Sequence, residues 1–77
     1  MPVKQRVFEI VAKAFKMAAE DLREETNLLS DLKAKSVNYF PIINALNDEY
    51  DLDLQYQIFR KQCQTVGDIV RMIEKAI

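Results

Sequence analysis

The sequence predicts an all-α fold that forms a single domain over residues 1–77. Apolar residues recur in several stretches at the three- and four-residue spacing that places side chains on one face of a helix. The chain has one glycine and two prolines, so it lacks most of the turn residues on which β-hairpins depend. Its composition, 49% hydrophobic and 30% charged, is typical of a folded domain and not of a disordered one.

A first amphipathic helix is expected near the start of the chain. Pro2 suits its beginning, because the first helical positions have no use for the N–H that proline lacks. The apolar face of this helix is predicted to hold Val3, Val7, Ile10, Val11, Ala14 and Phe15. The connection that follows, from Met17 to Lys35, loses helical periodicity and is long for a compact domain. We expect four leucines to pin it to the core: Leu22, Leu28, Leu29 and Leu32.

A second helix is expected over roughly Val37 to Tyr50, and Pro41 governs where it can begin. A proline inside a helix costs about 3 kcal/mol, because it removes one hydrogen bond and clashes with the preceding turn. With Asn38 as the N-cap, Pro41 falls in the first turn, where no intrahelical donor is lost. We therefore expect a late or distorted start, which leaves Ser36 in the loop or in an irregular first turn.

The last third of the chain is predicted to hold an extended loop and two more helices. Leu52 and Leu54 are expected to point inward from the loop. A short third helix near Gln57 to Gln62 is expected to direct Ile58, Phe59 and Cys63 toward the core. Thr65 and Asp68 have the spacing of a capping box, in which each side chain accepts a hydrogen bond from the backbone of the other, so a final helix is expected after Thr65.

Several function classes are disfavoured by residues that the chain lacks. It has no histidine, which is the commonest general base and metal ligand. One cysteine and one glycine are too few for a zinc cluster or a phosphate-binding loop. A net charge of −1 provides no basic face for a nucleic acid. We therefore expect neither an autonomous enzyme, nor a resident metal, nor a nucleic-acid partner.

The sequence also predicts a cytoplasmic, monomeric protein that does not insert into a membrane. The lone Cys63 cannot form an internal disulfide, which fits a reducing compartment. No apolar run approaches the roughly 20 residues that a bilayer crossing requires, and the N-terminus lacks the pattern of a signal peptide.

An acidic zone, formed by Asp48, Glu49, Asp51 and Asp53, lies at and just beyond the C-terminal end of the apolar second helix. Two interpretations remain open: a solvated acidic face, or a surface that docks a basic partner. Carboxylates at the C-terminal end of a helix oppose its dipole, which is a small cost consistent with a docking role. A calcium site fits less well, because the loop lacks the glycine and the twelfth-position glutamate of a helix-loop-helix calcium site.

Four segments of the chain resemble, in order and spacing, those of the acyl carrier protein family. They are residues 27–32, 34–37, 45–54 and 65–70. The resemblance implies an acyl-carrier-like four-helix bundle with a long first loop and a short third helix. It also implies that Ser36 carries 4'-phosphopantetheine as an ester, so that the thiol of this arm holds an acyl group as a thioester.

The resemblance implies roles for further residues. Lys33 and Lys35 are expected to contact the phosphate of the arm. The acyl pocket is expected to be lined by Val7, Leu28, Leu29, Leu46, Leu54 and Phe59. The residues expected to dock partners are Val37, Asn38, Asp48 and Glu49. The implied partners are a phosphopantetheinyl transferase and the acyl-synthesis or acyltransferase enzymes of fatty-acid, specialised lipid or lipopolysaccharide biosynthesis.

The chain departs from the family pattern around the serine. Lys35 and Val37 stand where the family usually has aspartate and leucine, and Lys33 stands where glycine is common. A reversed charge beside the serine should weaken contact with partners built to bind carboxylates, so we expect a specialised carrier with dedicated partners. Two alternatives stay open: an unmodified, carrier-derived interaction module, and a carrier domain of a polyketide or peptide synthesis pathway.

Overall fold

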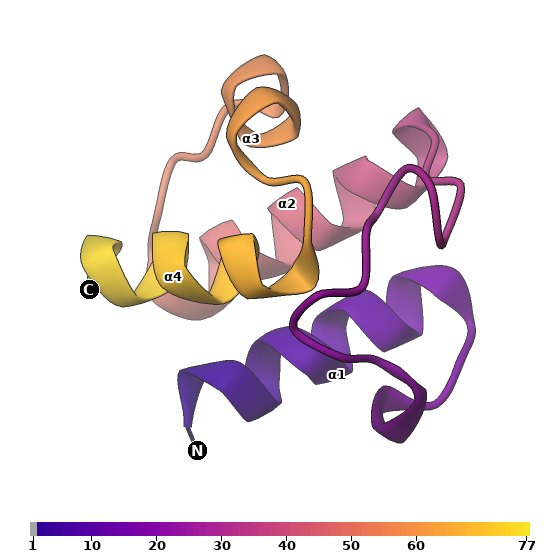
Figure 1. Ribbon diagram of the computed structural model, residues 1–77. Helices are drawn as coiled ribbons and strands as arrows, with labels where there is room; N and C mark the ends of the chain where they lie inside the picture. Colours follow the sequence, from indigo (N-terminus) through magenta and orange to yellow (C-terminus); the bar gives the residue numbers. More distant parts are fainter. Residues whose placement is uncertain (1) are drawn as a thin grey trace.

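The computed structural model describes residues 2–77, and over this range the chain is helical (Figure 1). Its α-helices are α1 (Val3–Phe15), α2 (Ser36–Tyr50), α3 (Tyr56–Gln62) and α4 (Val66–Ala76). A short 3-10 helix, η1 (Ala19–Asp21), lies in the long connection between α1 and α2 and was not predicted. The predicted four-helix fold, with its long first loop and short third helix, is confirmed.

The core lies where α1 packs against both α2 and α4, while α3 packs on α2 (Figure 1). Each of these helices directs an apolar face inward, as the spacing of their hydrophobic residues requires. The fully buried side chains include Val7, Val11, Leu28, Tyr39, Ile42, Leu46, Phe59, Cys63, Val66, Ile69 and Ile73. None of the helices in residues 2–77 has the length and apolar character that a bilayer crossing requires.

Helix α2 begins one residue earlier than expected, and its start is regular. Lys35 is the extended N-cap and Ser36 is the first helical residue, so the predicted late or distorted start is wrong. Pro41 lies inside the helix, and the N–H that it lacks would have paired with the carbonyl of Val37. Val37 is 74% exposed, so the turn that contains this carbonyl lies at the surface of the protein. Asn38 compensates further, because its Oδ1 accepts a hydrogen bond from the Lys35 N–H at 3.0 Å.

The first loop is fixed to the start of α4 by backbone hydrogen bonds. The N–H of Val66 donates to the Thr26 carbonyl at 3.0 Å, and the N–H of Gly67 donates to the Glu24 carbonyl at 2.9 Å. These donors belong to the first turn of α4 and have no acceptor within their own helix. A Cβ on Gly67 would lie 3.0 Å from the Glu24 carbonyl oxygen, which is tighter than most real Cβ contacts, so the close approach favours glycine. The loop therefore caps α4 and is held in place by it.

Three of the four loop leucines pack as expected. Leu22 and Leu28 are buried and Leu32 is partly buried against the core. Leu29 is 45% exposed and lies outside the core, so its predicted packing role is wrong. Its N–H donates instead to the Asn27 side chain at 2.9 Å, in a turn that directs the leucine away from the bundle.

The predictions for the last helices hold with one exception. Thr65 and Asp68 form the expected capping box: the Asp68 N–H donates to Thr65 Oγ1 at 3.2 Å, and the Thr65 N–H donates to Asp68 Oδ2 at 3.1 Å. Phe59 and Cys63 are each 1% exposed, and the Cys63 thiol donates to Met72 Sδ at 3.7 Å. Ile58 is 53% exposed, so its predicted inward orientation is wrong: successive residues of a helix point about 100° apart, and Phe59 occupies the inner face.

Candidate functional site

The site is built around the hydroxyl of Ser36. As the first residue of α2, Ser36 is exposed, and its Oγ lies 3.0 Å from the hydroxyl oxygen of Tyr56. Tyr56 is the first residue of α3. The side-chain contact therefore brings the starts of these two helices together.

Tyr56 is held in this position by two neighbours. Nη1 of Arg60, one turn further along α3, donates to the Tyr56 hydroxyl at 3.1 Å. The ring of Phe40 stacks on that of Tyr56 with a centroid distance of 4.7 Å and an interplanar angle of 23°. The hydrogen bond with Ser36 is the main cause that lowers the pKa of Tyr56; burial opposes it, and the hydrogen bond and charge of Arg60 reinforce it. We call these three polar side chains the Ser36–Tyr56–Arg60 array.

A buried aromatic ring packs against the interior side of the Ser36–Tyr56–Arg60 array. Tyr39 is 1% exposed and meets the ring of Tyr56 edge-on at a centroid distance of 5.9 Å. It makes a similar contact with Phe59 at 6.2 Å. The Arg60 guanidinium lies 5.8 Å from the Tyr39 ring centroid, within the range of a cation–π contact. The Tyr39 hydroxyl is itself buried and has no hydrogen-bond partner within residues 2–77.

The two lysines expected at the phosphate lie beside Ser36 in the chain but do not contact its side chain. Lys33 and Lys35 are exposed, and neither side chain makes a hydrogen bond or ion pair to the described residues. Tyr56 contacts the Ser36 hydroxyl instead, Arg60 contacts Tyr56, and sequence reasoning missed both residues. Their four-residue spacing, which places them on one face of α3, was the only local signal.

The side chains expected to line an acyl pocket lie mostly in the core. Val7, Leu28, Leu46 and Phe59 are buried together, and Leu54 is partly buried against them. Leu29 is the exception, because it points toward solvent. The structure therefore brings five of the six residues into one apolar cluster, and their role in binding a cargo stays a prediction.

The expected docking residues are spread along α2. Val37 is strongly exposed beside Ser36, whereas the Asn38 amide is engaged with the Lys35 N–H and the Ala14 carbonyl. Asp48 and Glu49 lie at the other end of the helix, about 18 Å from Ser36 at 1.5 Å per residue. Glu49 also accepts a hydrogen bond from Arg6 Nη2 at 3.0 Å, which joins α2 to α1. The four residues thus do not form a single patch.

Comparison with known proteins identifies the family. A family model described as a phosphopantetheine attachment site matches residues 5–73. The chain is 31% identical over 75 residues to an acyl carrier protein of Streptococcus thermophilus, which covers 97% of this chain and 96% of that protein. The chain belongs to the acyl carrier protein family. It is therefore a carrier protein and not an enzyme, its cofactor is 4'-phosphopantetheine, and these predictions are confirmed.

Two further relatives show how widely this type of carrier domain is used. An acyl carrier protein of Wolinella succinogenes is 28% identical over 74 residues, which covers 96% of each chain. A non-reducing polyketide synthase (pgmA) of Aspergillus terreus is 32% identical over 69 residues, or 90% of this chain. The carrier spans only 3% of the length of that synthase. The relatives therefore include both free-standing carriers and one segment of a very large protein.

The residues around Ser36 fit the phosphodiester end of this cofactor. The Ser36 hydroxyl is exposed, and the N–H groups of Ser36 and Val37 belong to a first helical turn that offers them no intrahelical acceptor. Such N–H groups and the positive end of the helix dipole favour a bound anion. The Arg60 side chain adds a permanent positive charge on the facing helix.

Proposed function

We propose that Ser36 is the residue that carries 4'-phosphopantetheine, and that the carrier presents acyl groups bound as thioesters to the thiol of this arm. The observation that supports this assignment is the exposed hydroxyl of Ser36 at the first residue of α2, inside the segment that the family model matches. The other serine, Ser30, lies in the first loop, away from the start of any helix.

The chemistry of attachment asks little of the carrier itself. Transfer from coenzyme A forms a bond between Ser36 Oγ and phosphorus, breaks the pyrophosphate linkage and releases adenosine 3',5'-bisphosphate. The hydroxyl proton passes to a base of the phosphopantetheinyl transferase. The carrier has to expose the hydroxyl and hold it in a fixed place, and the capped first turn of α2 is suited to this task. Once bound, the cofactor supplies the thiol on which acyl groups are carried.

Intact-mass analysis tests the proposal. The unmodified carrier is incubated with coenzyme A and a broad-specificity phosphopantetheinyl transferase, and we expect it to gain the mass of one phosphopantetheinyl group. Ser36→Ala should abolish this gain, whereas the matched control Ser30→Ala should keep it. A gain that survives Ser36→Ala would reject the assignment. No gain in the wild type, together with partner binding that Ser36→Ala leaves intact, would favour the unmodified interaction module instead.

Partner docking is proposed along α2, at Val37 and Asn38 near Ser36, and at Asp48 and Glu49 near the other end of the helix. Beside Val37 a surface groove of about 600 Å³ is lined by residues of both α1 and α2, and Lys13 and Lys16 are among them. Neither lysine has an ion pair within residues 2–77. This charge favours partner enzymes whose contact surface is acidic near the arm.

A charge-reversal experiment tests the docking proposal. Lys16→Glu should raise the KM of a cognate partner enzyme for the carrier several-fold with little change in kcat, because the lysine contributes to association and not to chemistry. Lys61→Glu, at an exposed residue of α3 that does not line the groove, makes the same change of charge and should leave the KM near the wild-type value. Equal effects of the two variants would attribute the change to net charge and would reject the groove as a docking surface.

The proposed partners are the transferase and the acyl-synthesis or acyltransferase enzymes of fatty-acid, specialised lipid or lipopolysaccharide biosynthesis. The polyketide synthase relative supports polyketide assembly as a second candidate pathway. A monomer in the cytoplasm is proposed for the carrier, since its one cysteine is free and buried. Native mass spectrometry of the carrier purified from its own cell, with the arm and cargo attached, would identify both the acyl class and the oligomeric state.

A further inference from the structure

We infer that Tyr56 and Arg60 form the binding site for the phosphodiester that joins the arm to Ser36. In this site the Arg60 guanidinium pairs with the anionic phosphate oxygens, and the Tyr56 hydroxyl donates a hydrogen bond to one of them. The inference deepens the proposed function and rests on it, because it requires Ser36 to be the attachment point. It assigns the recognition of the arm's charged end to α3 and not to the lysines that precede Ser36.

Arg60 has a positive charge that no carboxylate in residues 2–77 neutralises. The ion pairs of the described chain join Lys4 to Glu24, Arg6 to Glu9 and Glu49, and Arg71 to Asp68. Arg60 uses one of its N–H groups to donate to the neutral Tyr56 hydroxyl. A guanidinium has five N–H donors in a planar fork, which matches the geometry of two phosphate oxygens. The remaining donors are therefore available for an anion.

The array places this charge close to the atom that receives the phosphate. Tyr56 contacts both of the other residues: its hydroxyl oxygen is 3.0 Å from Ser36 Oγ and 3.1 Å from Arg60 Nη1. A phosphate esterified to Ser36 Oγ projects its free oxygens two bonds beyond that atom. The free oxygens thus come within reach of both side chains without a change in the helices.

The array is also held in shape before any anion arrives. Phe40 stacks on the Tyr56 ring, and Tyr39 supports both Tyr56 and Arg60 from the buried side. A binding site whose side chains are already ordered loses less conformational entropy when it binds. Lys33 and Lys35 have no comparable support, because their side chains make no polar contact within the described chain. This difference favours Arg60, over the two lysines that precede Ser36 in the chain, as the residue that binds the phosphate.

Esterification changes the hydrogen bonding of the array in one direction. Ser36 Oγ loses its proton when the phosphate ester forms, so it can no longer donate to Tyr56. The Tyr56 oxygen still accepts from Arg60, and its own O–H is then free to donate to the new anionic oxygen. Of the groups that lower the Tyr56 pKa, Ser36 loses its donor on esterification, whereas the hydrogen bond and the charge of Arg60 stay in place. Esterification thus replaces the hydrogen bond between the Ser36 and Tyr56 hydroxyls with a hydrogen bond from Tyr56 to a charged phosphate oxygen.

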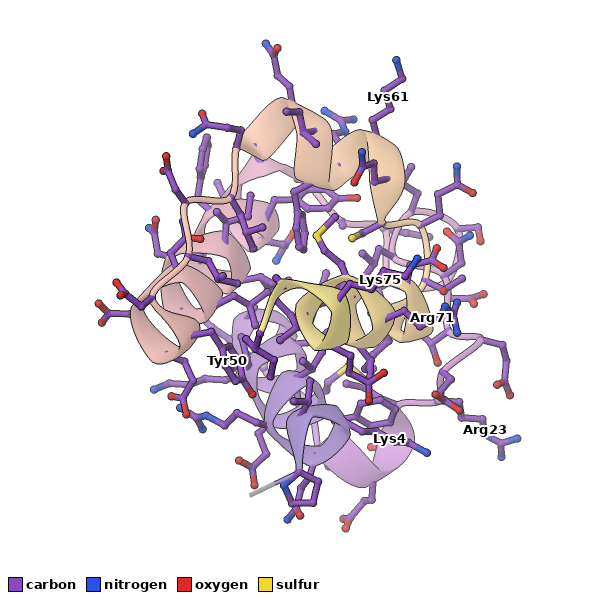
Figure 2. All side chains as sticks on the ribbon, turned by 90° about the vertical axis from the view of Figure 1, so that its left-hand side faces the viewer. Lys4, Arg23, Tyr50, Lys61, Arg71 and Lys75 are labelled. Carbon is purple, nitrogen blue, oxygen red and sulfur yellow. The ribbon has the colours of Figure 1, made fainter. Side chains whose placement is uncertain are left out.

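Phosphorus NMR of the loaded carrier tests the inference directly. The phosphodiester resonance is compared among the wild type, Arg60→Gln, Arg60→Lys and the matched control Lys61→Gln. Lys61 is the next residue of α3, and Figure 2 shows its side chain pointing away from the bundle. We expect Arg60→Gln to shift the resonance clearly and Lys61→Gln to leave it within error, although both remove one positive charge. Arg60→Lys should retain the charge but not the planar fork, and should give an intermediate shift.

Added salt provides a second measurement. The wild-type resonance should move as salt screens the ion pair, and that of Arg60→Gln should be nearly insensitive. Tyr56→Phe keeps the ring stacked on Phe40 and removes only the hydroxyl, so it should shift the resonance in the same direction by a smaller amount. If circular dichroism shows that Arg60→Gln does not fold, the resonance of Tyr56→Phe tests the inference in its place.

The outcomes separate this inference from the proposed function. A wild-type carrier that gains no mass at Ser36 would reject the attachment site, and the inference with it. If Ser36 is fully modified and Arg60→Gln, Tyr56→Phe and Lys61→Gln all give the wild-type phosphorus resonance, the inference is rejected and the proposed function stands.

Discussion

Asn47 is the residue whose replacement should best reveal how the loop between α2 and α3 is held. Its Oδ1 accepts a hydrogen bond from the Leu54 N–H at 2.8 Å, and its Nδ2 donates to the Leu54 carbonyl at 3.4 Å. The loop leads from Leu54 through Gln55 to Tyr56, the first residue of α3. Asn47→Ala therefore tests both the stability of the fold and the placement of Tyr56 against Ser36.

The expected loss of stability follows from these two bonds. A side-chain hydrogen bond contributes about 0.5–1.5 kcal/mol net, and the longer of the two should lie at the low end, so together they contribute about 1.5 kcal/mol. Alanine is the better helix former by up to about 0.7 kcal/mol, which offsets part of the loss. Asn44→Ala is the matched control, because Asn44 lies on the same helix, is exposed and gains the same helix propensity. The difference between the two variants isolates the bonds to Leu54.

Urea unfolding followed by circular dichroism measures this difference. We expect Asn47→Ala to have a free energy of unfolding about 1.5 kcal/mol below that of Asn44→Ala, and a Tm about 6–12 °C lower for a domain of this size. The Tyr56 amide resonance should also move in Asn47→Ala and not in Asn44→Ala. Surface substitutions ordinarily change the free energy of unfolding by up to about 0.5 kcal/mol. If the free energies of unfolding of the two variants differ by no more than this, the account of the loop is wrong.

Three further predictions concern buried or capping groups. Tyr39→Phe removes a buried hydroxyl that has no partner, so it should raise the free energy of unfolding by about 1 kcal/mol; a loss of stability would mean that the hydroxyl is hydrogen-bonded in solution. Burial raises the pKa of Asp68, but hydrogen bonds from Arg71 and from the Gln64 and Thr65 N–H groups outweigh it and lower the pKa overall. The stability that this carboxylate contributes is present above its unfolded pKa and is lost as the pH falls through its folded pKa. Asp68→Asn should therefore cost about 1 kcal/mol at neutral pH in urea unfolding, and a penalty that persists in strong acid would contradict the assignment. Burial raises the pKa of Cys63 to about 12. The stability that the protonated thiol contributes to the folded state is therefore fully present below its unfolded pKa, and it is lost as the pH rises toward the folded pKa. Between about pH 8 and about pH 10 the wild type should lose about 1.4 kcal/mol more than Cys63→Ala, and equal losses would show that the thiol ionises normally in the folded state.

The sequence was sufficient to predict the helices because their signals are local. The apolar spacing of α1 and the capping box of Thr65 and Asp68 can each be recognised within one or two turns, and both predictions are confirmed. Ile58 was misplaced because a helix of seven residues is too short for periodicity to define its inner face. The start of α2 was misplaced because the local cost of Pro41 was weighed without the compensating bond from the Lys35 N–H to Asn38.

The candidate site was only partly predictable for a different reason. Ser36 is recognisable by its position relative to the segments shared with the family. Tyr56 contacts Ser36 from the other end of the α2–α3 loop, and Arg60 contacts Tyr56, so the array depends on the way in which that loop closes. Their importance becomes visible only once the two helix starts are adjacent in space. The exposure of Leu29 depends in the same way on the turn formed around Asn27.

The burial of Cys63 has a practical consequence for the loaded protein. Its sulfur lies in the interior beside Met72, where thiol reagents and a tethered sulfhydryl have no access to it. The carrier therefore cannot form an internal mixed disulfide with its own prosthetic arm while it is folded. A thiol-selective dye should label only molecules that carry the arm with its thiol free. Dye uptake therefore measures the fraction of carrier that is ready for acylation.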